Sequence, residues 1–192
     1  GYSTRPGADV VSLSDELKRV IPALSAIRQQ FPDTLLSIDT FRSEVASQAI
    51  DAGATMINDV SGGTIDPAIW SVAAARKVPY VLMHMRGNPQ TMSSFTQYDQ
   101  VTVDVVHELS KQVANARAAG IHDIIVDPGF GFAKTIDQNF ELLNNLEHFH
   151  FLDCPILVGL SRKSTIYKTL HIEPQEALNG TTVLNTIALT KG

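Results

Sequence analysis

The sequence predicts an α/β fold, part of a (β/α)8 barrel with about five parallel strands and alternating helices. Short apolar runs alternate with amphipathic stretches along the 192 residues, as expected when parallel strands are joined by crossover helices. Each run leads into a polar residue, and barrel enzymes place their functional groups at the carboxyl ends of strands. These residues are Asp39, Asn58, His84, Asp127 and Ser161. A closed barrel has eight strands, so we expect a single barrel domain over residues 1–192, truncated at both ends.

The elements follow in order along the chain. Apolar residues at helical spacing between Leu13 and Phe31 predict an amphipathic helix, with Ser12 or Ser14 as its N-cap. The expected strands cover residues 35–39, 54–57, 79–83, 123–126 and 155–158. The remaining helices are expected over residues 42–52, 66–76, 101–119, 137–149 and 177–190. An open doubly wound sheet would also fit five strands, but no Gly-rich dinucleotide-binding motif opens any of these helices.

Composition narrows the possible partners. Fifteen Lys and Arg against twenty Asp and Glu give a net charge of −5, which argues against a nucleic acid partner but allows a small anionic ligand. No apolar run approaches the roughly 18 residues that span a bilayer, so we expect no membrane partner. The single cysteine, Cys154, excludes an intrachain disulfide, and we expect a cytoplasmic location.

Polar residues at the first three strand ends have two interpretations each. Asp39 is a site carboxylate or a cap for the next helix. Asn58 is a turn residue, or a donor and acceptor for a planar heterocycle, and it lies nearer the strand than Asp59. His84 stands between two methionines and has no second metal ligand at informative spacing, so we interpret it as barrel lining and assign no protein metal site.

Two later loops and the N-terminal segment complete the candidate site. In residues 127–135, Asp127 precedes glycines that let backbone and aromatic rings approach a ligand. Residues 159–164 place hydroxyls and two cations at a strand end, suited to a ligand with carbonyl, ring-nitrogen and anionic groups; a Schiff-base lysine is the alternative. Residues 1–8 combine hydroxyls with Arg5 in a turn-rich loop, either an anion clamp or a solvated terminus.

Six motifs, taken together and in order, resemble those of the dihydropteroate synthases. They are Ser3-Thr4-Arg5-Pro6-Gly7, Ser37-Ile38-Asp39-Thr40, Ile57-Asn58-Asp59-Val60-Ser61-Gly62-Gly63, Met83-His84-Met85, Asp127-Pro128-Gly129-Phe130-Gly131-Phe132 and Gly159-Leu160-Ser161-Arg162-Lys163-Ser164. The resemblance implies a transferase of folate biosynthesis. Such an enzyme condenses 6-hydroxymethyl-7,8-dihydropterin diphosphate with p-aminobenzoate to give 7,8-dihydropteroate and diphosphate, and is a sulfonamide target.

The resemblance also implies roles for individual residues. Catalytic roles fall on Lys163, Asp39 and Arg5. Pterin binding falls on Asp39, Asn58, Met83, Asp127 and Lys163. Binding of p-aminobenzoate falls on Thr4, Pro6, Phe132 and Ser161. Magnesium would arrive with the diphosphate, its family protein ligand lying in an absent N-terminal part. The partners would be these small molecules, with a homodimer possible.

Two alternatives remain open. The chain could be an inactive pterin-binding module, because missing strands leave sheet edges exposed, and we expect the fragment alone to be inactive. It could also be a corrinoid-type methyltetrahydrofolate methyltransferase domain, which resembles this family in its barrel and pterin pocket. Membership of that second class would not explain why the Ser3–Pro6 and Ser161–Ser164 segments occur together.

Overall fold

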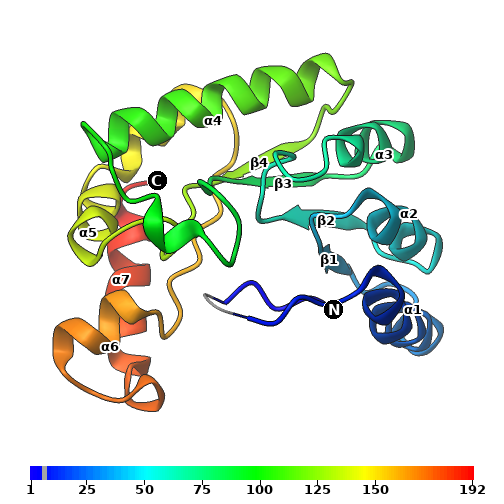
Figure 1. Cartoon of the computed structure of the whole chain (residues 1–192), viewed down its shortest axis with the longest axis horizontal. Coiled ribbons are helices and arrows are strands. Elements are labelled where there is room, and N and C mark those ends of the chain that lie inside the picture. The colour runs from blue at the N-terminus through cyan, green and yellow to red at the C-terminus, as the bar shows by residue number, and fades with distance from the viewer. Residues whose placement is uncertain (6–7) are drawn as a thin grey trace.

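Four parallel strands form the centre of the molecule, and they lie side by side in the order in which they occur along the chain (Figure 1). They are β1 (Ser37–Asp39), β2 (Met56–Asp59), β3 (Tyr80–Met83) and β4 (Ile124–Asp127). The computed structural model describes residues 1–5 and 8–192. Because each strand neighbours the next and all are parallel, every connection is a βα crossover unit, as in the wall of a (β/α)8 barrel.

The register of the sheet places the predicted pterin residues on one face. Asp39 pairs with Asn58, and Asn58 pairs with Val81. Met83, two residues beyond Val81, pairs with Asp127. Residues paired across a parallel sheet point to the same side, and so do residues two apart along a strand. Asp39, Asn58, Met83 and Asp127 therefore share the face that lines the inside of a barrel.

The opposite face of the sheet is buried against helices. Ile38, Ile57 and Tyr80 occupy consecutive paired positions on that face, and none is more than 5% exposed. The covering helices are α1 (Leu13–Gln30), α2 (Ser43–Asp51), α3 (Ala68–Arg76) and α4 (Val101–Ala118), which follow one another around the outer side of the sheet (Figure 1). The main apolar core of the protein lies between these two layers.

The first helix begins where the sequence predicts. The Ser12 hydroxyl accepts a hydrogen bond from the Asp15 amide at 3.1 Å, so Ser12 rather than Ser14 is the N-cap of α1.

Among the residues that the structure describes, no helix combines the length and apolar character that a membrane crossing requires.

The predicted helix over residues 137–149 is two elements. Helix α5 (Ile136–Asn144) is followed by a turn at Asn145, and a 3-10 helix, η2 (Leu146–Leu152), begins at the next residue. Leu146, Phe149 and Leu152 recur every three residues and all three are buried. A 3-10 helix has three residues per turn, so this geometry directs all three side chains into the core.

The segment over residues 155–158 lies next to β4, as expected for a fifth strand, but it pairs through a single parallel bridge between Val126 and Ile156. The Val126 amide donates to Pro155 O at 2.9 Å, and the Leu157 amide donates to Val126 O at 2.8 Å. Pro155 has no amide hydrogen to extend the ladder. The wall therefore consists of four strands and a bridged fifth segment.

The C-terminal part of the chain is helical. It contains α6 (Ser164–Leu170), the short 3-10 helix η3 (Pro174–Glu176) and α7 (Leu178–Thr190). The sequence analysis predicted α7 but missed α6, whose seven residues are too few to show a periodic apolar pattern. A further 3-10 turn, η1 (Met92–Ser94), lies in the connection between β3 and α4. This connection runs beside the N-terminal segment (Figure 1).

Candidate active site

Asp39 is a carboxylate at the open end of β1 and is not a helix cap. The first amide of α2, that of Ser43, is bonded at 2.7 Å to the carboxylate of Asp66 instead. The Asp39 side chain is reached by solvent, yet the protein around it raises its pKa to about 6. Desolvation is the main cause, and the charge of Asp59 adds to it. A carboxyl group kept at this cost at the open end of a strand is a candidate for ligand binding.

Asp59, the neighbour of Asn58, has a structural role on the helix side of the sheet. Its carboxylate accepts hydrogen bonds from the Ser61 amide and hydroxyl and from the Gly63 amide, each at 2.8 Å, and from the Tyr80 hydroxyl at 2.6 Å. Burial raises the pKa of Asp59, and these hydrogen bonds work in the opposite direction. Asp59 is therefore bound on the helix side of the sheet, and Asn58 is the residue of this pair that faces the barrel interior.

Asp127 is buried at the end of β4, with 7% of its surface exposed. Its carboxylate accepts a hydrogen bond from the Gly129 amide at 2.7 Å. Burial raises the pKa of Asp127, while the Gly129 amide and the charges of Lys163 and Lys134 act to lower it. A buried carboxylate beside two ammonium groups can accept the N–H groups of a heterocycle without first losing a bulk water shell.

Lys163 reaches across from the opposite side of this loop. Its ammonium group donates to Phe130 O and lies 5.1 Å above the centre of the Phe132 ring. Burial lowers the pKa of Lys163, and the charge of Asp127 partly restores it. The structure thus brings together Asp127, Phe132 and Lys163, three of the residues that the sequence predicts in the site.

An apolar cluster completes the inner surface and draws on several connections. It joins Met83, 4% exposed, to residues that follow β1, β2, β3 and β4, with Tyr2 and Phe132 packed against it. The buried members are Phe41, Val60, Met83, Met85, Met92 and Ala133. The predicted pterin residue Met83 and the predicted p-aminobenzoate residue Phe132 therefore belong to one apolar surface.

The N-terminal segment is held over this cluster by its aromatic residue. The Tyr2 ring packs edge-on against Phe41, with 5.0 Å between ring centres. Gln90 donates to the Tyr2 hydroxyl at 3.1 Å and to Ala8 O at 3.3 Å. Thr4 is partly buried and Arg5 is exposed, and the predicted residue Pro6 lies outside the described residues.

Ser161 is the predicted p-aminobenzoate residue nearest to Lys163 in the sequence. Its side chain is exposed in the turn before α6. The structure places it two positions from Lys163 but gives its hydroxyl no hydrogen bond within the described part of the chain. Its assignment to the p-aminobenzoate pocket stays a prediction.

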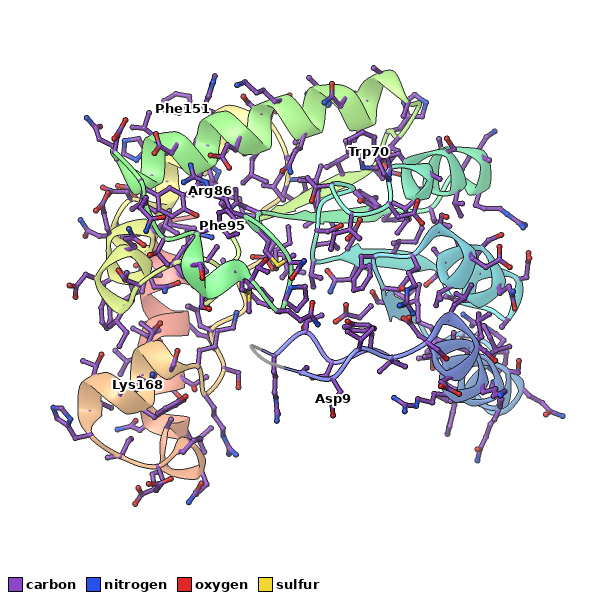
Figure 2. All side chains as sticks on the ribbon, viewed as in Figure 1. Asp9, Trp70, Arg86, Phe95, Phe151 and Lys168 are labelled. Carbon is purple, nitrogen blue, oxygen red and sulfur yellow. The ribbon has the colours of Figure 1, made fainter. Side chains whose placement is uncertain are left out.

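The sequence analysis missed a buried polar network behind Asp127. Lys134 Nζ lies 3.0 Å from Nδ1 of His84, and Nε2 of His84 lies 3.0 Å from the carboxylate of Glu108 on α4. Arg86 donates to the same carboxylate at 3.0 Å, and Figure 2 shows it beside α4. The interpretation of His84 as barrel lining needs correction, because it follows inward-facing Met83 and so points toward α4.

The surroundings shift the pKa values of the groups in this network. Burial, together with the neighbouring charge of Lys134, lowers the pKa of His84 to about 4, so the ring is neutral near pH 7. Burial also lowers the pKa of Lys134 to about 7. Although partial burial opposes it, hydrogen bonds from His84 and Arg86 lower the pKa of Glu108 to about 2.

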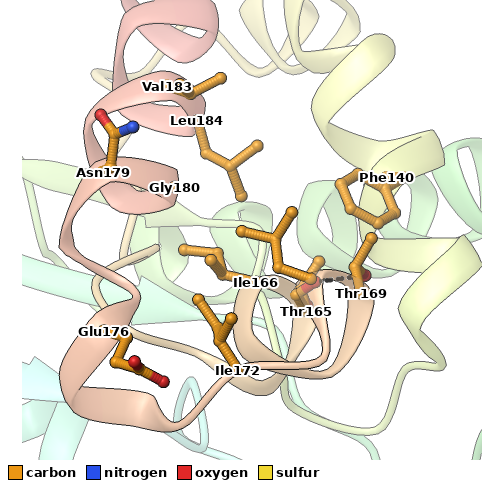
Figure 3. A pocket seen from close by; sticks show the side chains of 11 residues that line it. Phe140, Thr165, Ile166, Thr169, Ile172, Glu176, Asn179, Gly180, Val183 and Leu184 are labelled. Atoms are coloured by element: carbon orange, nitrogen blue, oxygen red, sulfur yellow. Dashed lines mark hydrogen bonds between the residues drawn. The ribbon is translucent and has the colours of Figure 1, made fainter.

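A groove elsewhere in the molecule carries no comparable chemistry. A groove of about 490 Å³ opens between α5, α6 and α7, and Phe140, Ile166 and Leu184 line it (Figure 3). The Thr169 hydroxyl is bonded within α6 to Thr165 O at 2.6 Å. Because its lining is mainly apolar and it lies away from the strand ends, we place the candidate site at the inner face of the sheet.

A parallel barrel wall with carboxylates, an amide and a lysine at its carboxyl edge is the arrangement that (β/α)8-barrel proteins use for binding sites. The family model of the pterin-binding enzymes matches residues 1–192, and the chain belongs to that family. A dihydropteroate synthase from Synechocystis is 51% identical over 94% of this chain.

Solved structures agree with the sequence comparison. The dihydropteroate synthase of Yersinia pestis, solved with a sulfonamide drug, superposes with a TM-score of 0.94 at 38% identity over 100% of this chain and 70% of its own. That of Xanthomonas albilineans, solved with 4-aminobenzoic acid, has a TM-score of 0.92 at 38% identity over 100% of this chain and 68% of its own. The present chain spans 63% of the length of the Synechocystis relative.

Proposed function

We propose that this chain is the pterin-binding part of a dihydropteroate synthase, which condenses 6-hydroxymethyl-7,8-dihydropterin diphosphate with p-aminobenzoate. The observation that carries the proposal is the shared inward face of Asp39, Asn58, Met83 and Asp127, with Lys163 at its edge. The relatives named above are synthases, which favours this activity over that of a corrinoid methyltransferase.

The residues suit a pterin in chemical detail. The Asp127 carboxylate can accept hydrogen bonds from a ring N–H and the exocyclic amine, and Asn58 can donate to one edge atom and accept from another. Lys163 has an ammonium group with three donors, of which one is used by Phe130 O in the described structure. The others are available for a ring carbonyl or nitrogen. Met83 supplies apolar contact from the same face.

The reaction needs positioning and electrostatics rather than a protein nucleophile. The amine nitrogen of p-aminobenzoate forms a bond to the pterin methylene carbon, the C–O bond to diphosphate breaks, and the electron pair leaves with the diphosphate. The amine then loses a proton. Thr4, Pro6, Phe132 and Ser161 would shape the p-aminobenzoate pocket, Arg5 would attract the departing anion, and the loops would exclude water.

Magnesium is expected with the diphosphate from the family resemblance. The described residues contain no group of three or more His, Cys, Asp or Glu side chains that could hold a metal ion. The scheme above assigns no step to the ion.

Three further expectations belong to the same proposal. A sulfonamide should compete with p-aminobenzoate, since the related Yersinia enzyme was solved with such a drug. A homodimer and a cytoplasmic location stay predictions from the sequence.

Titration calorimetry with the pterin diphosphate tests the proposal. We expect saturable binding by the chain, weakened by about 1 to 3 kcal/mol, roughly 5- to 150-fold, in Asp127→Ala and in Lys163→Ala, because each change leaves a buried polar partner unpaired. Lys168→Ala is the matched control, since Lys168 is exposed on α6 (Figure 2). Unchanged affinity in both site variants, with circular dichroism of a folded protein, would overturn the assignment.

Turnover separates the synthase from the inactive module. A chain that binds the pterin diphosphate but forms no dihydropteroate with p-aminobenzoate is a binding module in isolation. The same assay on a protein of the full length of its relatives then decides whether the activity belongs to the longer protein.

A further inference from the structure

Two lysines lie near Asp127, and their hydrogen bonds differ. Lys163 donates to one carbonyl, that of Phe130, within the described structure. Lys134 has three acceptors around its ammonium group: His84 Nδ1 at 3.0 Å, Gly129 O at 3.1 Å and Phe132 O at 3.0 Å. A lysine ammonium group has three N–H donors, so Lys134 uses all of them within the protein.

We propose that Lys134 is a positioning residue, which holds the loop between β4 and α5 around Asp127 and, in its protonated form, places a positive charge behind that carboxylate. The proposal rests on the function proposed above, because Asp127 is there the acceptor for the pterin. It assigns to Lys134 no contact with the ligand.

Gly129 is hydrogen-bonded both to Asp127 and to Lys134. The Gly129 amide donates to the Asp127 carboxylate at 2.7 Å, and its carbonyl accepts from Lys134. Lys134 also binds the carbonyl of Phe132, which lies on the apolar surface of the site. One buried ammonium group thus orients the two ends of the loop that the ligand would meet.

The network behind Lys134 keeps it in this orientation. His84 is neutral near pH 7, and its Nδ1 must accept from the ammonium group, so its Nε2 carries the hydrogen and donates to Glu108. Glu108 is held in turn by Arg86. The negative charge of Glu108 therefore balances Lys134 across the imidazole ring, and a buried cation without such a partner would be costly.

The charges of Lys134 and Lys163 act on Asp127, and three further groups, His84, Glu108 and Arg86, surround Lys134. Lys134 lies on its own loop and Lys163 precedes α6, while His84 follows β3, Glu108 belongs to α4 and Arg86 lies in the connection after β3. The pKa of Lys134 is about 7, so its charge is present below that pH. Removing that charge should make Asp127 harder to ionise.

The first test needs no ligand. The carboxyl carbon of Asp127 is followed by ¹³C NMR as pH is varied, and Asp127→Asn identifies its signal. We expect Lys134→Met to move the titration midpoint of Asp127 to higher pH by about one unit or more. The control Lys168→Met should leave the midpoint in place. An unchanged midpoint in a folded Lys134→Met protein overturns the proposal, because loss of a merely structural contact would not alter this titration selectively.

The second test uses the unmodified chain, so it decides the matter if Lys134→Met does not fold. Lysines are acetylated with and without the pterin diphosphate, and the modified sites are quantified by mass spectrometry. We expect Lys134 to stay unreactive in both samples, Lys163 to be protected by the ligand, and exposed Lys168 to react in both. Reaction of Lys134 as fast as Lys168, or its protection by the ligand, overturns the proposal. Absence of protection at Lys163 counts instead against the proposed function and leaves the result at Lys134 intact.

Discussion

The backbone at Gly129 offers a sharp test of how the loop after β4 is built. Gly129 has φ +72°, and a Cβ placed there would lie 2.0 Å from the carbonyl oxygen of His84. Gly129→Ala therefore has two costs. The left-handed backbone costs a residue with a side chain about 1 to 3 kcal/mol, and forcing an atom into a packed site typically costs a further 1 to 3 kcal/mol or so.

Gly120→Ala is the matched control, because it carries the first cost without the second. Gly120 has φ +98°, and the nearest atom to an added Cβ is the Ala74 methyl at an ordinary 3.4 Å. The difference between the two variants should therefore be about 1 to 3 kcal/mol in the free energy of unfolding. For a domain of this size 1 kcal/mol corresponds to about 2 to 4 °C in Tm.

Urea unfolding followed by circular dichroism measures this difference, and calorimetric titration with the pterin diphosphate measures its effect on the site. Gly129→Ala should unfold at lower urea concentration than Gly120→Ala and should bind the ligand more weakly, since the Gly129 amide orients Asp127. Equal unfolding midpoints for the two variants would refute the steric reasoning. Equal affinities would refute the link from Gly129 to the site.

Two further predictions concern the carboxylates of β1 and β2. Tyr80→Phe removes the hydroxyl that donates to buried Asp59 at 2.6 Å and should cost about 1.5 to 3 kcal/mol in urea unfolding, whereas Tyr167→Phe, whose hydroxyl has no hydrogen bond in the described structure, should cost little. Asp39 has a folded pKa of about 6 against an ordinary 3.8, so the folded state holds more protons between these values and wild-type stability falls as pH rises through that window. Asp39→Asn should therefore be more stable than wild type at pH 7 and equal to it below about pH 4, and a pH-independent difference in unfolding midpoint would contradict this.

The barrel wall could be predicted because its signals are local. Each strand is a short apolar run followed by a polar residue, and the paired positions Asp39 and Asn58 both come at strand ends. Parallel strands joined by helices bring these ends to one edge, so a linear pattern becomes a spatial cluster. The inward face of the predicted pterin residues follows from the same alternation, since side chains in a strand change sides at every residue.

The departures from prediction have equally local causes. Apolar residues at Leu146, Phe149 and Leu152 fit the continuation of an α-helix poorly but fit three residues per turn, and they direct the chain into a 3-10 helix. Pro155 at the start of the fifth segment removes one ladder donor, so a run with strand composition forms a single bridge. In residues 146–152 side-chain composition predicted the burial correctly and the backbone geometry incorrectly, whereas residues 155–158 are only partly buried or exposed.

The network behind Lys134 could not be predicted, because its bonds to His84 and onward to Glu108 join residues far apart in the sequence. Lys134 and His84 are 50 positions apart, and His84 and Glu108 are 24 apart. In the sequence Lys134 is one cation in a glycine-rich loop, and nothing local separates it from Lys163. What separates them is the number of acceptors that the fold provides: three for Lys134 and one for Lys163 within the described structure. Lys134, whose N–H donors all bind protein acceptors, stabilises the loop. Lys163 has donors left in the described structure, so it is the lysine that can bind a ligand.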